Sequence, residues 1–118
     1  MTRAFKILSF QIAVLAAGGV MMTTVATMTH AAAPPAAAVQ IDNFTFEAPT
    51  LTVRPGTTVT WTNQDDIPHT VVANDKSFKS RVLDSDERFA FTFTRPGEYA
   101  YFCSLHPHMV GKVIVRPA

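Results

Sequence analysis

The sequence predicts a small all-β domain, a sandwich or barrel of about seven or eight short strands. From Val39 onward, apolar and polar residues alternate with the period of two that is typical of half-buried strands. Turn residues separate these runs roughly every ten residues, as in β-sandwiches and small barrels. No segment of about ten residues or more shows the 3.6-residue period of a helix.

Several segments have strand character, and in chain order they are 39–42, 44–46, 51–53, 57–62, 69–73, 89–93, 99–103 and 112–115. The clearest is TTVTWT, because β-branched and aromatic residues are enriched in strands and Val59 and Trp61 fall on one face. Arg-Pro-Gly occurs at 54–56 and again at 95–97, and Pro-Gly is a strong turn signal.

The segment 74–86 does not follow either period. It is polar and irregular, and we expect three apolar residues to anchor it to the core: Phe78, Val82 and Leu83.

The N-terminal residues have the pattern of a secretory signal peptide. Two basic residues precede an apolar run at 7–22 that is short for a bilayer span, which needs about 20 apolar residues. Small residues follow, as at a cleavage site. We predict a signal peptide over 1–31, with cleavage after Ala31 or, as a second candidate, after Ala38. An uncleaved membrane anchor is the alternative.

Beyond the predicted signal, an Ala/Pro-rich lead-in spans 32–38 and a single domain spans 39–118. The lack of a twin arginine favours the general export route, so we expect the mature chain in a bacterial periplasm. The signal holds two of the ten basic residues, Arg3 and Lys6, so its removal changes the net charge from +1 to −1. Without a basic run, nucleic acid is not an expected partner. We expect a monomer without stable membrane insertion.

The segment CSLHPHM, residues 103–109, concentrates residues that bind soft metals. Cys103 is the only cysteine of the chain, and His106 and Met109 follow it at equal spacing. Met109 is also the only methionine beyond the predicted signal, whereas a chain that used Met as a core filler would hold several. Considered alone, Cys103 also fits a buried core cysteine.

His69 is the fourth candidate ligand. It begins a predicted strand, and a sandwich can bring that strand end beside the loop 103–109. Two imidazoles, a thiolate and a weak axial thioether form a type 1 copper site, which transfers single electrons. We therefore predict one copper ion, cycling between Cu(II) and Cu(I), with four ligands: His69, Cys103, His106 and Met109.

Zinc is the competing metal, because two His and one Cys bind zinc together with a water or a third His such as His108. We expect His108 to point away along the rim of the loop. An enzyme fits less well, since a Cys-His nucleophile pair needs an orienting Asn or Asp and a substrate cleft. The acidic pairs at 65–66 and 86–87 fit solvated loop charge.

Residues 39–117 resemble the cupredoxins, and among them the amicyanins most closely. The resemblance lies in TTVTWTNQDDIPHTV, which contains His69, and in FTFTRPGEYAYFCSLHPHMVGKVIV, which contains the other three candidate ligands. Gaps of two residues between Cys, His and Met distinguish this loop from those of plastocyanins and azurins. The resemblance implies a Greek-key β-sandwich that holds copper near one end and carries electrons.

The resemblance also implies that electrons pass through an exposed edge of His106. The surrounding apolar patch would consist of Ile67, Pro68, Leu105, Pro107 and Val110. Its partners would be redox proteins such as a periplasmic dehydrogenase, a reductase or a cytochrome c.

One departure from the amicyanin pattern leaves a second function open. Amicyanin-like sites usually have Asn after the first histidine, where it links the two ligand loops, and this chain has Thr70. We expect the Thr70 hydroxyl to do part of that work. The alternative function is a copper-binding or buffering protein without a dedicated redox partner, and the rate of copper exchange discriminates the two.

Overall fold

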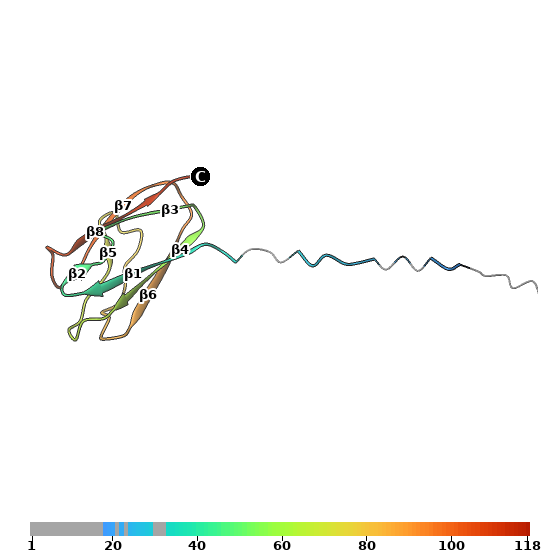
Figure 1. Ribbon diagram of the computed structural model, residues 1–118. Helices are drawn as coiled ribbons and strands as arrows, with labels where there is room; N and C mark the ends of the chain where they lie inside the picture. The colour runs from blue at the N-terminus through green and yellow to red at the C-terminus, as the bar shows by residue number, and fades with distance from the viewer. Residues whose placement is uncertain (1–17, 21, 23, 30–32) are drawn as a thin grey trace, which may run out of the picture. The chain divides into compact units, whose positions relative to one another are not determined.

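The structure is a computed structural model that describes residues 18–20, 22, 24–29 and 33–118 (Figure 1). Contacts divide the chain into two units, 1–30 and 31–118, and every described strand lies in the second. None of the described residues belongs to a helix that could span a bilayer. Most of the predicted signal peptide lies outside the described residues, so its assignment stays a prediction.

Eight strands form two four-stranded sheets, which confirms the predicted all-β class (Figure 1). One sheet has the order β2-β1-β4-β6 and the other β3-β8-β7-β5. The strands are β1 (Ala36–Asp42), β2 (Thr45–Phe46), β3 (Thr50–Val53), β4 (Thr57–Asn63), β5 (Val72–Ala73), β6 (Arg88–Phe93), β7 (Gly97–Phe102) and β8 (Val110–Val115).

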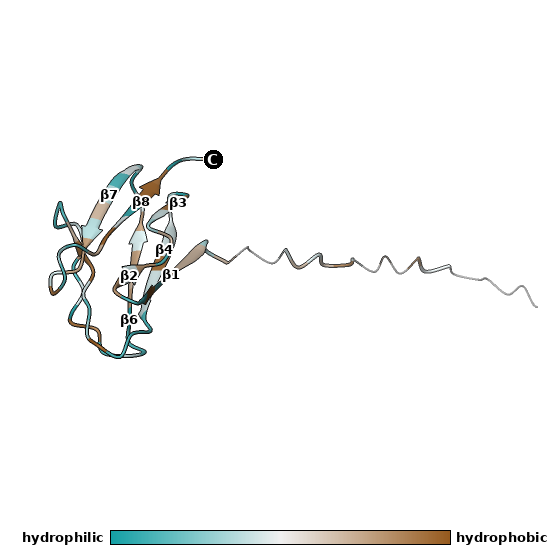
Figure 2. Ribbon diagram, turned by 60° about the vertical axis from the view of Figure 1, so that its left-hand side comes forward, coloured by the Kyte–Doolittle hydropathy of each residue, from teal (hydrophilic) through white to brown (hydrophobic). Residues whose placement is uncertain are grey.

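The core lies between the two sheets and is centred on Trp61 of β4. As predicted, Val59 and Trp61 are both buried, because β4 buries every second residue. The Trp61 ring meets Tyr101 of the opposite sheet edge to face at 5.4 Å between centroids. The C-terminal half of β8 is also hydrophobic (Figure 2). Its Val113 and Val115 side chains are buried and complete the contact between the sheets.

Two pairings are parallel and determine which ends of the strands meet. β1 runs parallel to β4, and β3 runs parallel to β8, whereas the remaining neighbours are antiparallel. β1 begins at Ala36, three residues before the predicted start of the domain, because Ala36, Ala37 and Ala38 pair with Thr58, Val59 and Thr60. The second half of the predicted lead-in is therefore strand.

The segment between β4 and β6 differs from the prediction in two ways. The predicted strand 69–73 is reduced to Val72–Ala73, and His69 instead forms an isolated antiparallel bridge with Leu83. Phe78 and Leu83 anchor the segment as predicted, but Val82 is 48% exposed. The bridge to His69 turns Leu83 inward, and its neighbour Val82 consequently faces outward.

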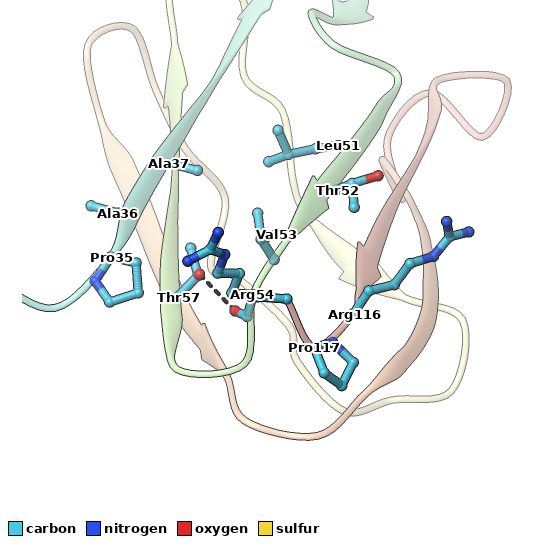
Figure 3. Close-up of a pocket in the computed structure, with 11 residues that line it drawn as sticks. Pro35, Ala36, Ala37, Leu51, Thr52, Val53, Arg54, Thr57, Arg116 and Pro117 are labelled. Atoms are coloured by element: carbon cyan, nitrogen blue, oxygen red, sulfur yellow. Dashed lines mark hydrogen bonds between the residues drawn. The ribbon is translucent and has the colours of Figure 1, made fainter.

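The two ends of the sandwich carry different features. At one end, Arg54 of the β3–β4 turn and Thr57 at the start of β4 help to line a surface pocket together with Arg116 and the start of β1 (Figure 3). β4 leads from this end to Asn63 at the other, where the loop 63–69 begins. None of the four predicted ligands lines the pocket, so the candidate metal centre lies elsewhere.

Candidate metal centre

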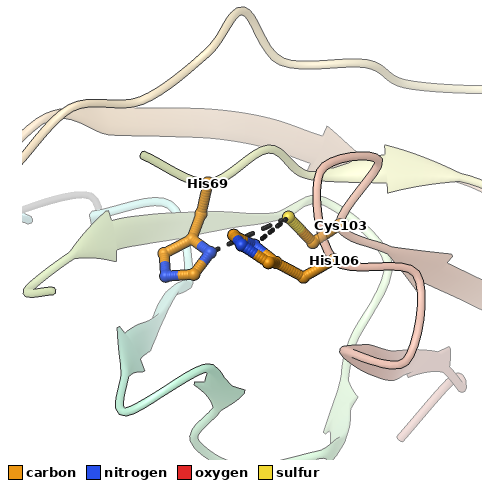
Figure 4. Close-up of side chains that lie close together, drawn as sticks. All are labelled: His69, Cys103 and His106. Atoms are coloured by element: carbon orange, nitrogen blue, oxygen red, sulfur yellow. Dashed lines mark hydrogen bonds between the residues drawn. The ribbon is translucent and has the colours of Figure 1, made fainter. Parts of the chain in front are cut away.

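Three of the four predicted ligands meet at the end of the sandwich opposite the pocket. His69 lies between β4 and β5, Cys103 directly follows β7, and His106 lies in the next turn. The Cys103 Sγ is 3.8 Å from His69 Nδ1 and 3.7 Å from His106 Nδ1 (Figure 4). Their donor atoms all lie within 4.8 Å of one another, so one ion can reach all three.

These distances fit a trigonal metal site. A metal about 2.0 Å from nitrogen and about 2.3 Å from sulfur, with bonds about 120° apart, separates the two donors by about 3.7 Å. The two measured sulfur–nitrogen distances agree with this value. The Cys103 side chain is fully buried, which suits a soft thiolate ligand better than a reactive surface thiol.

The loop 103–109 is closed by its own backbone. The Cys103 N–H donates to the Met109 carbonyl at 3.1 Å, and the Met109 N–H donates to the His106 carbonyl at 2.8 Å. The His106 N–H donates back to the Cys103 carbonyl at 3.2 Å. This closure brings the backbone of Met109 back to Cys103, and the Met109 residue is buried at 5% exposure, while His108 stays exposed as expected.

Asp65 fixes the orientation of His69. Its Oδ2 lies 2.7 Å from His69 Nε2. It also accepts hydrogen bonds from the backbone N–H groups of Asn43 at 2.6 Å and Phe44 at 3.0 Å. Burial raises the pKa of the Asp65 carboxyl, but the hydrogen bonds from Phe44, His69 and Asn43 outweigh it and lower the pKa below its usual value.

The ionised carboxylate determines which nitrogen of His69 is free. A carboxylate can only accept, so His69 Nε2 carries the proton and Nδ1 presents its lone pair toward Cys103. The prediction that Asp65 is only solvated loop charge is therefore wrong. The one feature of the sequence that could have indicated this contact is the position of Asp65 four residues before His69. In a loop, that spacing does not imply contact.

Thr70 links the two ligand segments, and its hydroxyl takes part in the link as expected. Its backbone N–H donates to Cys103 Sγ at 3.4 Å. Its hydroxyl accepts the Ser104 N–H at 2.7 Å and lies 2.7 Å from the Ser104 hydroxyl. The segment that holds His69 is thereby attached directly to the loop that holds Cys103 and His106.

Phe44 contacts both histidines and was missed by sequence reasoning. Its ring lies edge to face with His69 at 5.7 Å between centroids and with His106 at 5.1 Å. It forms, with Asn43, the two-residue turn between β1 and β2. The alternation of 44–46 indicated a strand residue and gave no reason to place this ring over a metal centre.

Four of the five residues expected to form an apolar patch around His106 are exposed. Pro68 and Pro107 are exposed, Leu105 is 46% exposed and Val110 is 61% exposed, whereas Ile67 is half-buried. Phe44 extends this surface. The His106 ring is partly exposed among these side chains.

A two-sheet β-sandwich with a His2Cys cluster at one end defines a class of metal-binding domain. Residues 14–115 match the cupredoxin-like domain family, and the chain belongs to it. The chain is 38% identical over 86 residues to amicyanin from Paracoccus versutus and 37% identical over 83 residues to amicyanin from Paracoccus denitrificans. These matches cover 69% and 66% of this chain but 65% and 63% of the relatives, slightly less than two thirds of their lengths.

Solved structures agree with the family. A purple cupredoxin from Nitrosopumilus maritimus matches with a TM-score of 0.65 and 35% identity, over 68% of this chain and 99% of that one. A reduced Cu(I) form of an amicyanin variant matches with a TM-score of 0.65 and 37% identity, over 72% and 86% of the two chains. The cluster of this chain is consistent with a type 1 copper site.

Other relatives in the comparisons are plastocyanins, including one from Tetradesmus obliquus at 38% identity over 84 residues. That match covers 60% of this chain and 58% of the relative. Relatives named amicyanin and plastocyanin fit the expectation that this chain is not an enzyme.

Proposed function

We propose that the protein is a type 1 copper protein that carries single electrons between redox proteins in the periplasm. The observation that carries the proposal is the set of three donors, two imidazole nitrogens and one cysteine sulfur, at the spacing of a trigonal site. Copper bound there supplies a one-electron couple between Cu(II) and Cu(I).

We propose His69, Cys103 and His106 as the three strong ligands and Met109 as the weak axial one. The thiolate and the thioether suit Cu(I), and the imidazoles also suit Cu(II). Asp65 holds His69, and Thr70 holds the Cys103 sulfur, so these hydrogen bonds would limit the movement of the donors when bound copper changes its oxidation state. Small changes in geometry on electron transfer keep the reorganisation barrier low.

The electron is proposed to enter and leave through the partly exposed edge of His106. The apolar patch around it suits a small, short-lived encounter. We propose a redox protein as partner, such as a periplasmic dehydrogenase, a reductase or a cytochrome c. Export by the predicted signal peptide would bring the chain to that compartment.

Visible absorption of the purified mature protein tests the proposal. On titration with Cu(II), we expect an intense copper–thiolate band that bleaches with ascorbate and returns on reoxidation. The Cys103→Ser variant should bind copper without that band. A colourless complex of the parent would show that Cys103 is not a Cu(II) ligand. Zinc binding or copper buffering would then be the better interpretation of the site.

A further inference from the structure

The turn between β1 and β2 has a backbone that its sequence does not favour. Asn43 and Phe44 have φ angles of 48° and 57°, both in the left-handed region. A two-residue hairpin turn with positive φ at both positions prefers Asn followed by Gly. Asn tolerates this conformation, but for a bulky residue such as Phe it is a strained outlier. Gly at position 44 would therefore favour the turn more than Phe does.

Asp65 holds the turn in this conformation. Its two carboxylate oxygens accept the backbone N–H groups of Asn43 and Phe44, and one of them also contacts His69. The strain at Phe44 is thus maintained by a group that itself orients a proposed copper ligand. Strained backbone that the surroundings enforce is concentrated at functional sites.

The strained position places an aromatic ring across the site. Phe44 touches both imidazoles edge to face, and yet half of the residue, 51%, remains exposed. A side chain needed only for core packing would be buried. The ring instead contacts the two histidines with part of its surface and solvent with the rest.

We propose that Phe44 is a cover of the metal centre, which keeps water and competing ligands away from the two imidazoles and so slows the release of copper. This inference rests on the proposed function and deepens it, because slow exchange is what separates an electron carrier from a copper buffer. Phe44 is a positioning and shielding residue and not a ligand. The apolar shell around a metal site controls solvent access in this way.

The test compares three variants of the mature copper protein. Phe44→Gly removes the ring and relieves the strain, Phe44→Tyr keeps a ring, and Asn43→Gly changes the neighbouring turn residue while leaving its N–H in place. Copper release to an excess of chelator is followed by stopped-flow loss of the visible band. We expect release roughly tenfold faster or more in Phe44→Gly. Phe44→Tyr and Asn43→Gly should release copper at the parent rate.

Urea unfolding of the copper-free proteins gives a second readout. Copper-free Phe44→Gly should unfold at the same or a higher urea concentration than the parent, since Gly accepts a positive φ without strain. If Phe44→Gly unfolds at the same or a higher urea concentration than the parent but releases copper faster, Phe44 serves the metal centre and not the stability of the fold.

The failures are distinguishable. If the parent forms the visible band but Phe44→Gly releases copper at the parent rate, the proposal that Phe44 covers the metal centre is wrong, and the proposed function stands. If Asn43→Gly releases copper as fast as Phe44→Gly, the turn and not the ring controls release, which also overturns the cover. If the parent forms no band, the proposed function itself fails.

Discussion

At the scale of single residues, Asp65 and Thr70 show how two of the proposed ligands are positioned. Asp65 orients His69 from outside the cluster, and Thr70 approaches Cys103 Sγ with both its N–H and its hydroxyl. Hydrogen bonds to ligands of this kind commonly affect metal affinity by a factor of about 10 to 100. The proposed ligands account for the chemistry of the site, and Asp65 and Thr70 account for the arrangement of those ligands.

The axial ligand is testable by one substitution. Met109→Gln should retain copper and the visible band but lower the reduction potential, because a harder axial ligand favours Cu(II). Protein-film voltammetry of the two proteins measures the change. An unaltered potential would show that Met109 is not the axial ligand.

Thr70 is expected to stabilise the fold as well as the site. Thr70→Val keeps the shape of the side chain but leaves the Ser104 N–H without its acceptor. The cost should be about 1–3 kcal/mol in the free energy of unfolding, measured by urea denaturation of the copper-free protein. Thr52→Val on the exposed part of β3 is the control and should change stability little. Equal stability of Thr70→Val and the parent would contradict a role for the Thr70 hydroxyl in joining the loops.

The sequence could predict the proposed ligands but not the residues that position and cover them, for a physical reason. Cys103, His106 and Met109 share one short loop, so their spacing alone indicates a common site. His69 stood out because only three histidines lie outside the predicted signal peptide. Asp65 and Phe44 are ordinary residue types in ordinary loop positions. Their roles arise from a contact between two turns more than 20 residues apart in sequence.

At the scale of elements, the loop 103–109 is a self-contained unit. Three hydrogen bonds between its own backbone groups set its shape, and β7 and β8 pair in register directly before and after it. The loop needs the remainder of the molecule chiefly to bring His69 beside it. The sequence predicted the strands of this hairpin, 99–103 and 112–115, to within two residues at each end, since β7 spans Gly97–Phe102 and β8 spans Val110–Val115.

The segment 81–87 is stabilised by a charged pair whose effect depends on pH. Arg81 Nη1 lies 2.7 Å from Glu87 Oε2, which also accepts the Asp84 N–H at 2.7 Å. The hydrogen bond from the Arg81 side chain, followed by that from the Asp84 backbone, lowers the pKa of the Glu87 carboxyl from 4.5.

A carboxyl group whose pKa is lowered by folding stabilises the folded state at pH values above its pKa in the unfolded chain. This stability is lost as the pH falls through its pKa in the folded state. Glu87→Gln should therefore be less stable than the parent at pH 7, and the difference should shrink below pH 4.5. Thermal unfolding of both proteins across this range measures the difference. Glu98→Gln is the control, because the Glu98 carboxylate is more exposed than that of Glu87 and lies 3.3 Å from its partner Lys112. A difference that does not change with pH would mean that the Glu87 charge is not responsible.

At the scale of the whole molecule, strand pairing brings distant donors together. Cys103 and His69 are 34 residues apart, and they meet because β5, which follows His69, pairs with β7, which ends just before Cys103. The all-β class, the turns and the approximate positions of most strands along the chain could be predicted from periodicity and turn residues. The parallel pairings of β1 with β4 and of β3 with β8 could not, because pairing depends on the whole sequence rather than on any one segment.

Copper should therefore stabilise the folded state as a whole. A ligand that binds only the folded chain adds about 2.7 kcal/mol at a concentration of a hundred times its Kd. For a domain of this size, that corresponds to roughly 10 °C or more in Tm. Differential scanning calorimetry of the parent with and without copper measures the shift, and Cys103→Ser should show a much smaller one. Equal shifts in both proteins would place the stabilising copper outside the predicted site.

The burial of Cys103 also has a consequence for the chain before it is folded. Its thiol is shielded only after β7, β8 and the segment around Thr70 have come together. Such long-range pairing makes β-proteins slow to fold. In an oxidising compartment, the unfolded chain exposes a thiol that has no second cysteine to pair with, and two chains can join through it. The speed of folding then determines how much protein escapes covalent dimerisation, so slowly folding variants should accumulate disulfide-linked dimers.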